Sequence, residues 1–310
     1  MPSKPKEFRK MKICFSAGGI SLLIASVLIS SADAQSFPLE FESCRLNVRE
    51  FVHEGAQGLP IILFNGIPAT GGIYRELVQN LAIRIPNPLM VVDLPQTGRS
   101  QLTHLRDISE TSWTRQRACV NEFLRIQPAH LLLVHDIAGP VVIPLLNGAI
   151  KTRGLIILNT ILKPSAFEPV LEMKLIAKSK WLAEHMPEWM FLNSLKRLGF
   201  DSDRIVPRQR LQELFKEVSF DDGLLKLHFI LRGFDLSEPS DALIERGLQH
   251  PIPQLVIWGL ADPSLGQQLS FLPAPHGPRE VVGFSNARHF LMVDYAEETS
   301  EKIHEWLVQL

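Results

Sequence analysis

The sequence predicts an α/β fold with a mostly parallel central sheet, flanking helices and an inserted helical cap. Short apolar runs with strand-like composition alternate with stretches of helical period. This alternation is typical of a parallel sheet with helices on both faces. The alternation stops over residues 162–251, where helical patterns and large apolar side chains continue without a convincing strand. We therefore expect this segment to be a cap over the carboxyl edge of the sheet, with a helical layer on the core as the alternative.

The expected strands are short and mostly apolar. Cys44, Leu46 and Val48 alternate with polar neighbours, which indicates a half-buried strand. Six further runs predict strands, the first four fully buried: residues 60–64, 89–92, 130–134, 154–158, 254–258 and 280–284. Helical patterns lie between them at residues 72–83, 109–124, 139–149 and 296–307. The core is then expected to comprise residues 35–161 and 252–310.

Composition narrows the partners that the chain is expected to have. Its 310 residues are 45% hydrophobic, which suits one large α/β domain with a lid or two modest domains. The net charge is -1 and no arginine-rich stripe is present, so no electrostatic argument favours nucleic acid. We expect a small-molecule ligand, no metal and no cofactor, while the oligomeric state stays open.

The N-terminus, residues 1–34, has the parts of a secretory signal peptide. Five basic residues precede an apolar run at 13–30, and Ala32-Asp33-Ala34 follows as a cleavage site. A membrane anchor is the alternative, although glycines and serines weaken the run as a permanent span. We therefore expect export to the periplasm or the medium, with no stable membrane span after cleavage behind Ala34.

Two cysteines remain in the chain after the expected cleavage, because Cys14 lies in the signal segment. An oxidising compartment permits a bridge between Cys44 and Cys119. Because these residues lie far apart in the sequence, two separate buried thiols are the favoured interpretation.

A candidate nucleophile follows the strand at 130–134. His135-Asp136-Ile137-Ala138-Gly139 predicts a strand, a sharp turn and a helix, which lifts the Asp136 side chain above the sheet. The common form of this turn is G-x-S-x-G, and here the nucleophile position is an aspartate. A helix N-cap is the alternative role for Asp136, since aspartate is favoured there.

Three more post-strand loops carry candidate site residues. Asn65-Gly66-Ile67-Pro68 follows one strand, and the N–H groups of Ile67 and Ile137 are expected to form an oxyanion hole. Asp262 and His289 follow the last two strands. Each of these segments has an ordinary alternative as a turn. Their order, however, is nucleophile, acid and histidine, which is the order of the α/β-hydrolase triad.

On these residues the sequence resembles the α/β-hydrolase superfamily, over roughly residues 41–310. It is most similar to the haloalkane dehalogenase and epoxide hydrolase branch, where the turn commonly reads H-D-x-G-G. The segments at 93–100 and 290–294 also resemble motifs of that branch. The resemblance implies that Asp136 attacks a small apolar alkyl halide or epoxide. His289 would then activate the water that hydrolyses the ester, with Asp262 as its partner. Of the two activities, dehalogenase-like activity is slightly favoured over epoxide hydrolysis.

Support for the leaving group is not evident in the sequence. The two tyrosines, Tyr74 and Tyr295, lie outside the expected cap, and Ile137 stands where dehalogenases carry a halide-binding tryptophan. The expected substrate pocket takes candidates from the strand ends and the cap: Asn65, Trp181, Trp189, Asn193 and His185. Simple packing is the alternative for the tryptophans. A catalytically silent binding protein is the second hypothesis, and a serine esterase ranks last because the turn has no serine.

Overall fold

The computed structural model describes residues 35–51, 55–104, 110–146 and 150–310. The expected signal peptide at 1–34 lies outside the described residues, as do position 109 and positions 147–149 of two expected helices. Within the described part of the chain, no helix is both long and apolar enough to span a membrane.

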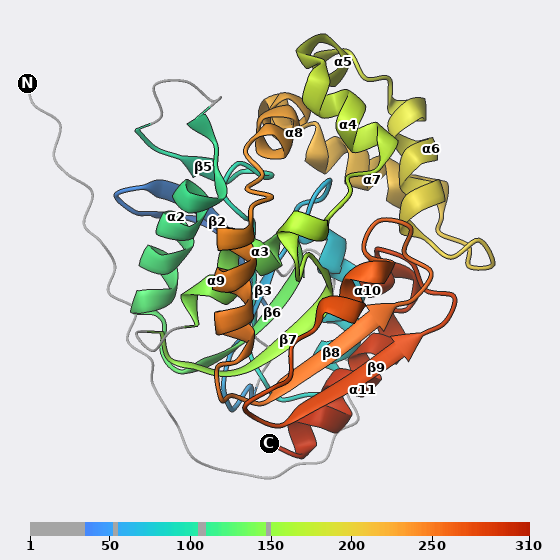
Figure 1. The fold of residues 1–310 in the computed structure, drawn as a ribbon. Helices are drawn as coiled ribbons and strands as arrows, with labels where there is room; N and C mark the ends of the chain where they lie inside the picture. The colour runs from blue at the N-terminus through green and yellow to red at the C-terminus, as the bar shows by residue number, and fades with distance from the viewer. Residues whose placement is uncertain (1–34, 52–54, 105–109, 147–149) are drawn as a thin grey trace, which may run out of the picture.

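The described strands form one sheet in the order β1-β2-β4-β3-β6-β7-β8-β9, with β5 beside β2 (Figure 1). Strand β2 is antiparallel to β1, β4 and β5, whereas the pairs from β4 to β9 are parallel. Each expected strand is present, and β1 and β5 were not expected. The bounds are β1 (Gln35–Glu40), β2 (Cys44–Phe51), β3 (Ile61–Phe64), β4 (Leu89–Val92), β5 (Gln101–Leu102), β6 (His130–Asp136), β7 (Thr152–Thr160), β8 (Gln254–Gly259) and β9 (Arg279–Phe284).

Two groups of helices pack on this sheet. One group is α1 (Arg75–Ala82), α10 (Leu291–Asp294) and α11 (Ala296–Val308), which contact one another. The other is α2 (Trp113–Ile126), α3 (Ala138–Val142) and α9 (Glu238–Leu248). Short 3-10 turns complete the connections: η1 (Gly71–Tyr74), η3 (Ile143–Leu145), η4 (Pro164–Ala166), η5 (Phe220–Asp222) and η6 (Gly266–Phe271). The mostly parallel α/β fold is thus confirmed.

The cap consists of helices inserted between β7 and β8, and it lies over one end of the sheet (Figure 1). Its helices are α4 (Leu171–Lys178), α5 (Lys180–Glu184), α6 (Glu188–Gly199), α7 (Arg208–Val218) and α8 (Gly223–Arg232). The expected cap at 162–251 is too long at its C-terminal end. Helix α9 contacts α3, η3 and η4, so it returns to the core before β8.

Charged groups fasten the cap to the core. Arg210 of α7 is buried, its Nε lies 2.7 Å from Oε1 of Glu76, and its Nη2 donates to the carbonyl oxygen of Gly72. Arg75 pairs with Glu213 at 2.6 Å on the same side. On the opposite side, the N–H of Phe290 donates to the carbonyl oxygen of Gly199 at 2.8 Å. The cap is therefore fastened to the core at the C-terminal end of α6 and along the first half of α7.

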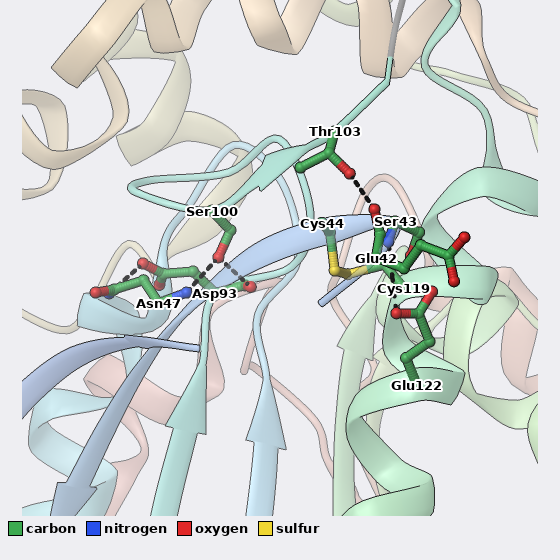
Figure 2. Close-up of a disulfide and its surroundings, with 9 residues drawn as sticks. All are labelled: Glu42, Ser43, Cys44, Asn47, Asp93, Ser100, Thr103, Cys119 and Glu122. Carbon is green, nitrogen blue, oxygen red and sulfur yellow. Dashed lines mark hydrogen bonds between the residues drawn. A yellow bond between two sulfur atoms is a disulfide. The ribbon is translucent and has the colours of Figure 1, made fainter. Parts of the chain in front are cut away.

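A disulfide joins Cys44 of β2 to Cys119 of α2, with 5.6 Å between the Cα atoms (Figure 2). The interpretation of these residues as separate thiols was wrong. The separation of 75 residues gave no sign of their proximity, which arises because α2 packs beside the start of β2. Figure 2 also shows the N–H of Ser43 donating to Glu122, which adds a second link between the same two elements. The antiparallel edge of the sheet is thus tied to a core helix.

We expect the Cys44→Ala/Cys119→Ala variant to unfold more easily than the wild type. A cross-link that closes so long a loop restricts the unfolded chain, and its removal costs about 2–4 kcal/mol of unfolding free energy. Urea denaturation measures this difference. Adding a reductant to the wild type should reproduce the loss and should not affect the variant. Equal midpoints for the two proteins would contradict a structural role for the bridge.

Candidate active site

The turn after β6 raises Asp136 out of the sheet. Asp136 has a φ of 53°, in the left-handed region that residues other than glycine seldom adopt, and α3 begins two residues later. Its neighbours must be small for this turn to form. A Cβ atom on Gly139 would collide with the Thr160 side chain, and one on Gly66 would collide with Asp136 itself. The turn therefore has the sharp strand-to-helix geometry that the sequence pattern predicts, and the N-cap residue of α3 is Ile137 and not Asp136.

The structure brings the three candidate triad residues together. Asp262 follows β8 and His289 follows β9, and the imidazole Nδ1 lies 2.9 Å from Oδ2 of Asp262. Asp136 and His289 line the same cavity. All three side chains are nearly buried, with exposed fractions of 3% for Asp136, 5% for Asp262 and 7% for His289. The geometry is that of a carboxylate facing a histidine that a second carboxylate orients.

Burial and mutual charge set the protonation of this pair. Burial by itself raises the pKa of Asp262, but the His289 imidazolium and several hydrogen bonds outweigh it, so the pKa is lowered. Burial lowers the pKa of His289, and the charge and hydrogen bond of Asp262 outweigh that effect, so the pKa is raised. The charge of Asp136 acts in the same direction on His289. Asp262 is thus ionised, and the imidazole is a stronger base than an isolated one.

Asn159, at the end of β7, holds Asp262 in place. Its Nδ2 donates to Asp262 Oδ2 at 2.8 Å and to the carbonyl oxygen of Gly259 at 3.1 Å, and its Oδ1 accepts from the Gly259 N–H. The other oxygen of Asp262 accepts from the N–H groups of Ser264 and Leu265. Both oxygens of the Asp262 carboxylate are therefore held by hydrogen bonds. This fixes the orientation of the carboxylate and, through it, of His289.

Two backbone N–H groups converge on Asp136. The N–H of Ile67 donates to Asp136 Oδ2 at 2.7 Å, and the N–H of Ile137 is hydrogen-bonded to the same carboxylate. Burial raises the pKa of Asp136, while the charge of His289 and these two amides oppose the increase without cancelling it. The amides expected as an oxyanion hole therefore both lie at Asp136, where an oxyanion on its Cγ would form.

His135 is a supporting residue that the sequence patterns did not single out. It is fully buried beneath His289, with 4.6 Å between the ring centroids, and its Nε2 lies 3.1 Å from the backbone oxygen of His289. Burial, together with the charge of His289, lowers the pKa of His135 well below the ordinary value. A neutral His135 donates from Nε2 and so anchors the His289 loop. The sequence feature that could have identified His135 is its position one residue before Asp136.

The cavity above Asp136 has a volume of about 140 Å³ and is almost entirely apolar. An apolar cavity of about 150 Å³ accommodates a molecule as large as benzene. The polar lining outside the triad consists of Glu172, Ser194 and Ser264. The cap supplies most of the rest, from α4, α5, α6, α8 and the connection between α5 and α6: Met173, Leu175, Ile176, Leu182, Met186, Met190, Phe191, Leu195, Leu198, Leu227 and Leu231.

The side chains expected to line the substrate pocket do not do so. Trp181 and Trp189 are 68% and 65% exposed on the outside of the cap, and Asn193 is exposed beside them. Exposed His185 stacks on Trp181 and not on the cavity. Asn65 is buried, but its amide is used by the carbonyl oxygens of Gly66 and Ala69 and by Leu94 N–H, so it braces the turn. These residues face outward, or into the backbone, because the inner cap faces carry aliphatic side chains and methionines.

The described residues contain no group of three or more His, Cys, Asp or Glu side chains that could hold a metal ion. The acidic and histidine side chains of the site instead pair with one another or with backbone amides.

Comparisons with known structures identify the fold. A Cif epoxide hydrolase from Acinetobacter nosocomialis is similar with a TM-score of 0.72 at 16% identity, over 90% of each chain. The haloalkane dehalogenase DbeA from Bradyrhizobium elkani gives 0.64 at 16% identity, over 89% of this chain and 98% of that one. A thioesterase domain from the curacin biosynthetic pathway gives 0.63 at 17%, over 87% and 99%. The fold is therefore the α/β-hydrolase fold.

At the level of sequence, comparison with protein-family models and with curated proteins finds no match. The structural neighbours also carry out different chemistries on one fold, so the fold alone does not assign an activity. The chemistry must be argued from the side chains of the site.

We expect Asn159→Ala to destabilise the protein by about 1–3 kcal/mol, because it removes one of the two hydrogen bonds to Oδ2 of the buried Asp262 and leaves the N–H of Gly259 without its partner. Urea denaturation at neutral pH checks this. Asn193→Ala is the matched control, since Asn193 is exposed and should change stability by less than about 0.5 kcal/mol. Equal effects of the two substitutions would show that Asn159 does not support the site.

Proposed function

We propose that this protein is a hydrolase that forms a covalent alkyl ester on Asp136, with small apolar alkyl halides as its substrates. The observation that carries the proposal is the position of Asp136. It is a buried carboxylate in an elbow turn, between two backbone N–H groups, and it faces an apolar cavity beside the His289–Asp262 pair. A helix cap would not need a histidine and a cavity in front of it.

In the first step an oxygen of Asp136 attacks the saturated carbon of the substrate. A carbon–oxygen bond forms, the carbon–halogen bond breaks, and the halide leaves with the bonding electrons. The carboxylate needs no general base for this step because it reacts as the anion. An apolar cavity favours the reaction, since its lining offers little solvation to the nucleophile.

In the second step water attacks the ester carbonyl carbon of Asp136. His289 takes a proton from this water, and the negative charge that develops on the carbonyl oxygen is held by the N–H groups of Ile67 and Ile137. The carbon–oxygen bond of the tetrahedral intermediate then breaks and the alcohol leaves with a proton from His289. Asp136 is restored as a carboxylate and one proton is released to solvent.

The lining of the cavity favours a halide over an epoxide as the leaving group. An opening epoxide generates an alkoxide, which is a strong base and needs a proton donor. No tyrosine, tryptophan or asparagine is among the residues that line the cavity, and His289 is its single histidine within the described residues. A halide is a weak base and leaves without a proton. The hydroxyls of Ser194 and Ser264 are the donors available to it.

The adduct on Asp136 provides the test. In His289→Gln the ester should form but hydrolyse about 10²–10⁴-fold more slowly, because the general base is missing. After incubation with a short alkyl bromide, intact-protein mass spectrometry should show a gain of one alkyl group less a hydrogen, and peptide mapping should place it on Asp136. A terminal epoxide of the same length would add its whole mass, and should do so more slowly.

Asp136→Asn in the same His289→Gln background is the matched control and should gain no mass. An adduct that persists in this control, or the absence of any adduct with both classes of electrophile, would reject the proposed nucleophile.

The pH dependence of turnover follows from His289. The unprotonated imidazole is the active form, so kcat should be low in acid and rise as His289 loses its proton. The pKa of His289 is raised from 6.5 in the free protein, partly by Asp136. Esterification neutralises Asp136, so the midpoint for kcat should lie below the pKa of His289 measured by NMR in the free protein. Asp262→Asn should move this midpoint further toward acid, and an unchanged midpoint would remove Asp262 from this role.

A binding protein without turnover is the second candidate function. It is favoured by the scarcity of leaving-group donors in the cavity. Such a protein would be stabilised by an unreactive apolar ligand such as benzene, yet would release no halide and form no adduct in the His289→Gln variant. Adduct formation therefore separates the two candidates.

We further propose that the protein works in an oxidising compartment outside the cytoplasm. The sequence of residues 1–34 has the parts of an export signal. The Cys44–Cys119 disulfide supports the same conclusion, because disulfides are rare in reducing compartments.

A further inference from the structure

The outer faces of the cap helices α4, α5 and α6 carry a mixed apolar and basic surface. Its apolar members are Leu171, Leu175, Trp181 and Trp189, all between 46% and 68% exposed, and its basic members are Lys174, Lys178 and Lys196. We call these seven residues the outer cap surface. Large exposed apolar side chains on helices that also line a cavity favour an interaction site.

Helical periodicity keeps most of this surface apart from the cavity. On α4, exposed Leu171, Lys174, Leu175 and Lys178 follow the i, i+3, i+4, i+7 spacing of one helix face, while buried Ile176 points to the cavity. On α6, Trp189 and Lys196 lie two turns apart on the same exposed face, whereas Phe191 and Leu195 line the cavity. Each helix is thus apolar on its inner face and carries apolar and basic residues together on its outer face.

The outer cap surface meets the cavity at Leu175. This side chain lines the cavity and is also 46% exposed, so it stands at the boundary between the cavity and the surface. An ion pair between Glu172 and Arg197 joins α4 to α6 next to it. A ligand that approaches the outer cap surface would therefore arrive beside the cavity that contains Asp136.

The charges of these helices leave a local positive excess. The three acidic residues on them are engaged: Glu172 with Arg197, Glu184 with Lys180, and Glu188 with the amide of Gln212. Within the described residues, no acidic side chain pairs with Lys174, Lys178 or Lys196. The chain as a whole has a net charge of -1, so this excess is local.

We propose that the outer cap surface docks on an anionic lipid surface. Tryptophan and leucine beside lysine is the composition of protein surfaces that lie in the membrane interface, where indole rings sit at headgroup level and lysines bind anionic headgroups. A second copy of the chain would carry the same lysines and would be repelled, which favours a lipid occupant. Small apolar substrates concentrate in membranes, so docking here brings the cavity to its source of ligand. The docking itself does not depend on the chemistry of Asp136.

Tryptophan fluorescence tests the docking, because Trp113, Trp258 and Trp306 are buried and Trp181 and Trp189 are exposed. The full chain is mixed with vesicles of phosphatidylcholine and phosphatidylglycerol that carry bromine in the acyl chains, which quenches indoles in contact with lipid. We expect quenching in the wild type and none in Trp181→Phe/Trp189→Phe. Quenching reports contact at these side chains even if another segment also binds the vesicle.

Charge is tested with Lys174→Ala/Lys178→Ala/Lys196→Ala, which keeps both exposed indoles. At about 1 kcal/mol per lysine near the surface, the three substitutions remove about 3 kcal/mol, so we expect about 100-fold more lipid to be needed for half-maximal quenching. Ile83→Ala/Ile126→Ala removes two exposed apolar side chains, one just after α1 and one at the end of α2, and should behave as the wild type. Absence of quenching at any lipid concentration would overturn the proposal, as would equal quenching without phosphatidylglycerol. A dimer that Trp181→Phe/Trp189→Phe dissociates, with no quenching by lipid, would assign the surface to a second copy instead.

Discussion

A buried carboxylate in a left-handed turn is the constraint around which the rest of this site is arranged. Asp136 has lost nearly all contact with water, so its charge must be balanced by groups that the protein supplies. The N–H groups of Ile67 and Ile137 and the imidazole of His289 provide that balance. Because the balance is incomplete, the pKa of Asp136 stays above the ordinary value. A carboxylate held in this way is poorly solvated and correspondingly reactive.

In the proposed mechanism the same groups serve both chemical steps, because the negative charge moves between them. Before reaction the negative charge is on Asp136 and favours the protonated form of His289. In an ester of Asp136 that charge is absent, so the pKa of His289 falls. The imidazole is then unprotonated when it must accept a proton from water. Asp262 stays ionised throughout, because Asn159 and two backbone amides hold its oxygens. The cap adds an apolar wall to the cavity, and its outer surface is where we propose that an anionic membrane docks.

Much of this arrangement could be predicted from the sequence, because strand ends in a parallel sheet share one edge. That rule by itself predicts that Asp136, Asp262, His289 and the Ile67 turn lie at one edge of the sheet. The substrate pocket could not be predicted in the same way. Which face of a cap helix points inward depends on packing against the core, and in this cap the aliphatic residues and methionines face inward while Trp181 and Trp189 face solvent. The disulfide was missed for a related reason, since sequence separation does not report which elements pack side by side.

Isotope labelling tests the covalent role of Asp136 most directly. Excess protein is allowed a single turnover of an alkyl bromide in water enriched in oxygen-18. If Asp136 is the nucleophile, the alcohol takes its oxygen from the carboxylate and leaves unlabelled, while the peptide that contains Asp136 gains oxygen-18. An alcohol that carries oxygen-18 after one turnover, with no label in the protein, would mean that water attacks the substrate directly and would contradict the account.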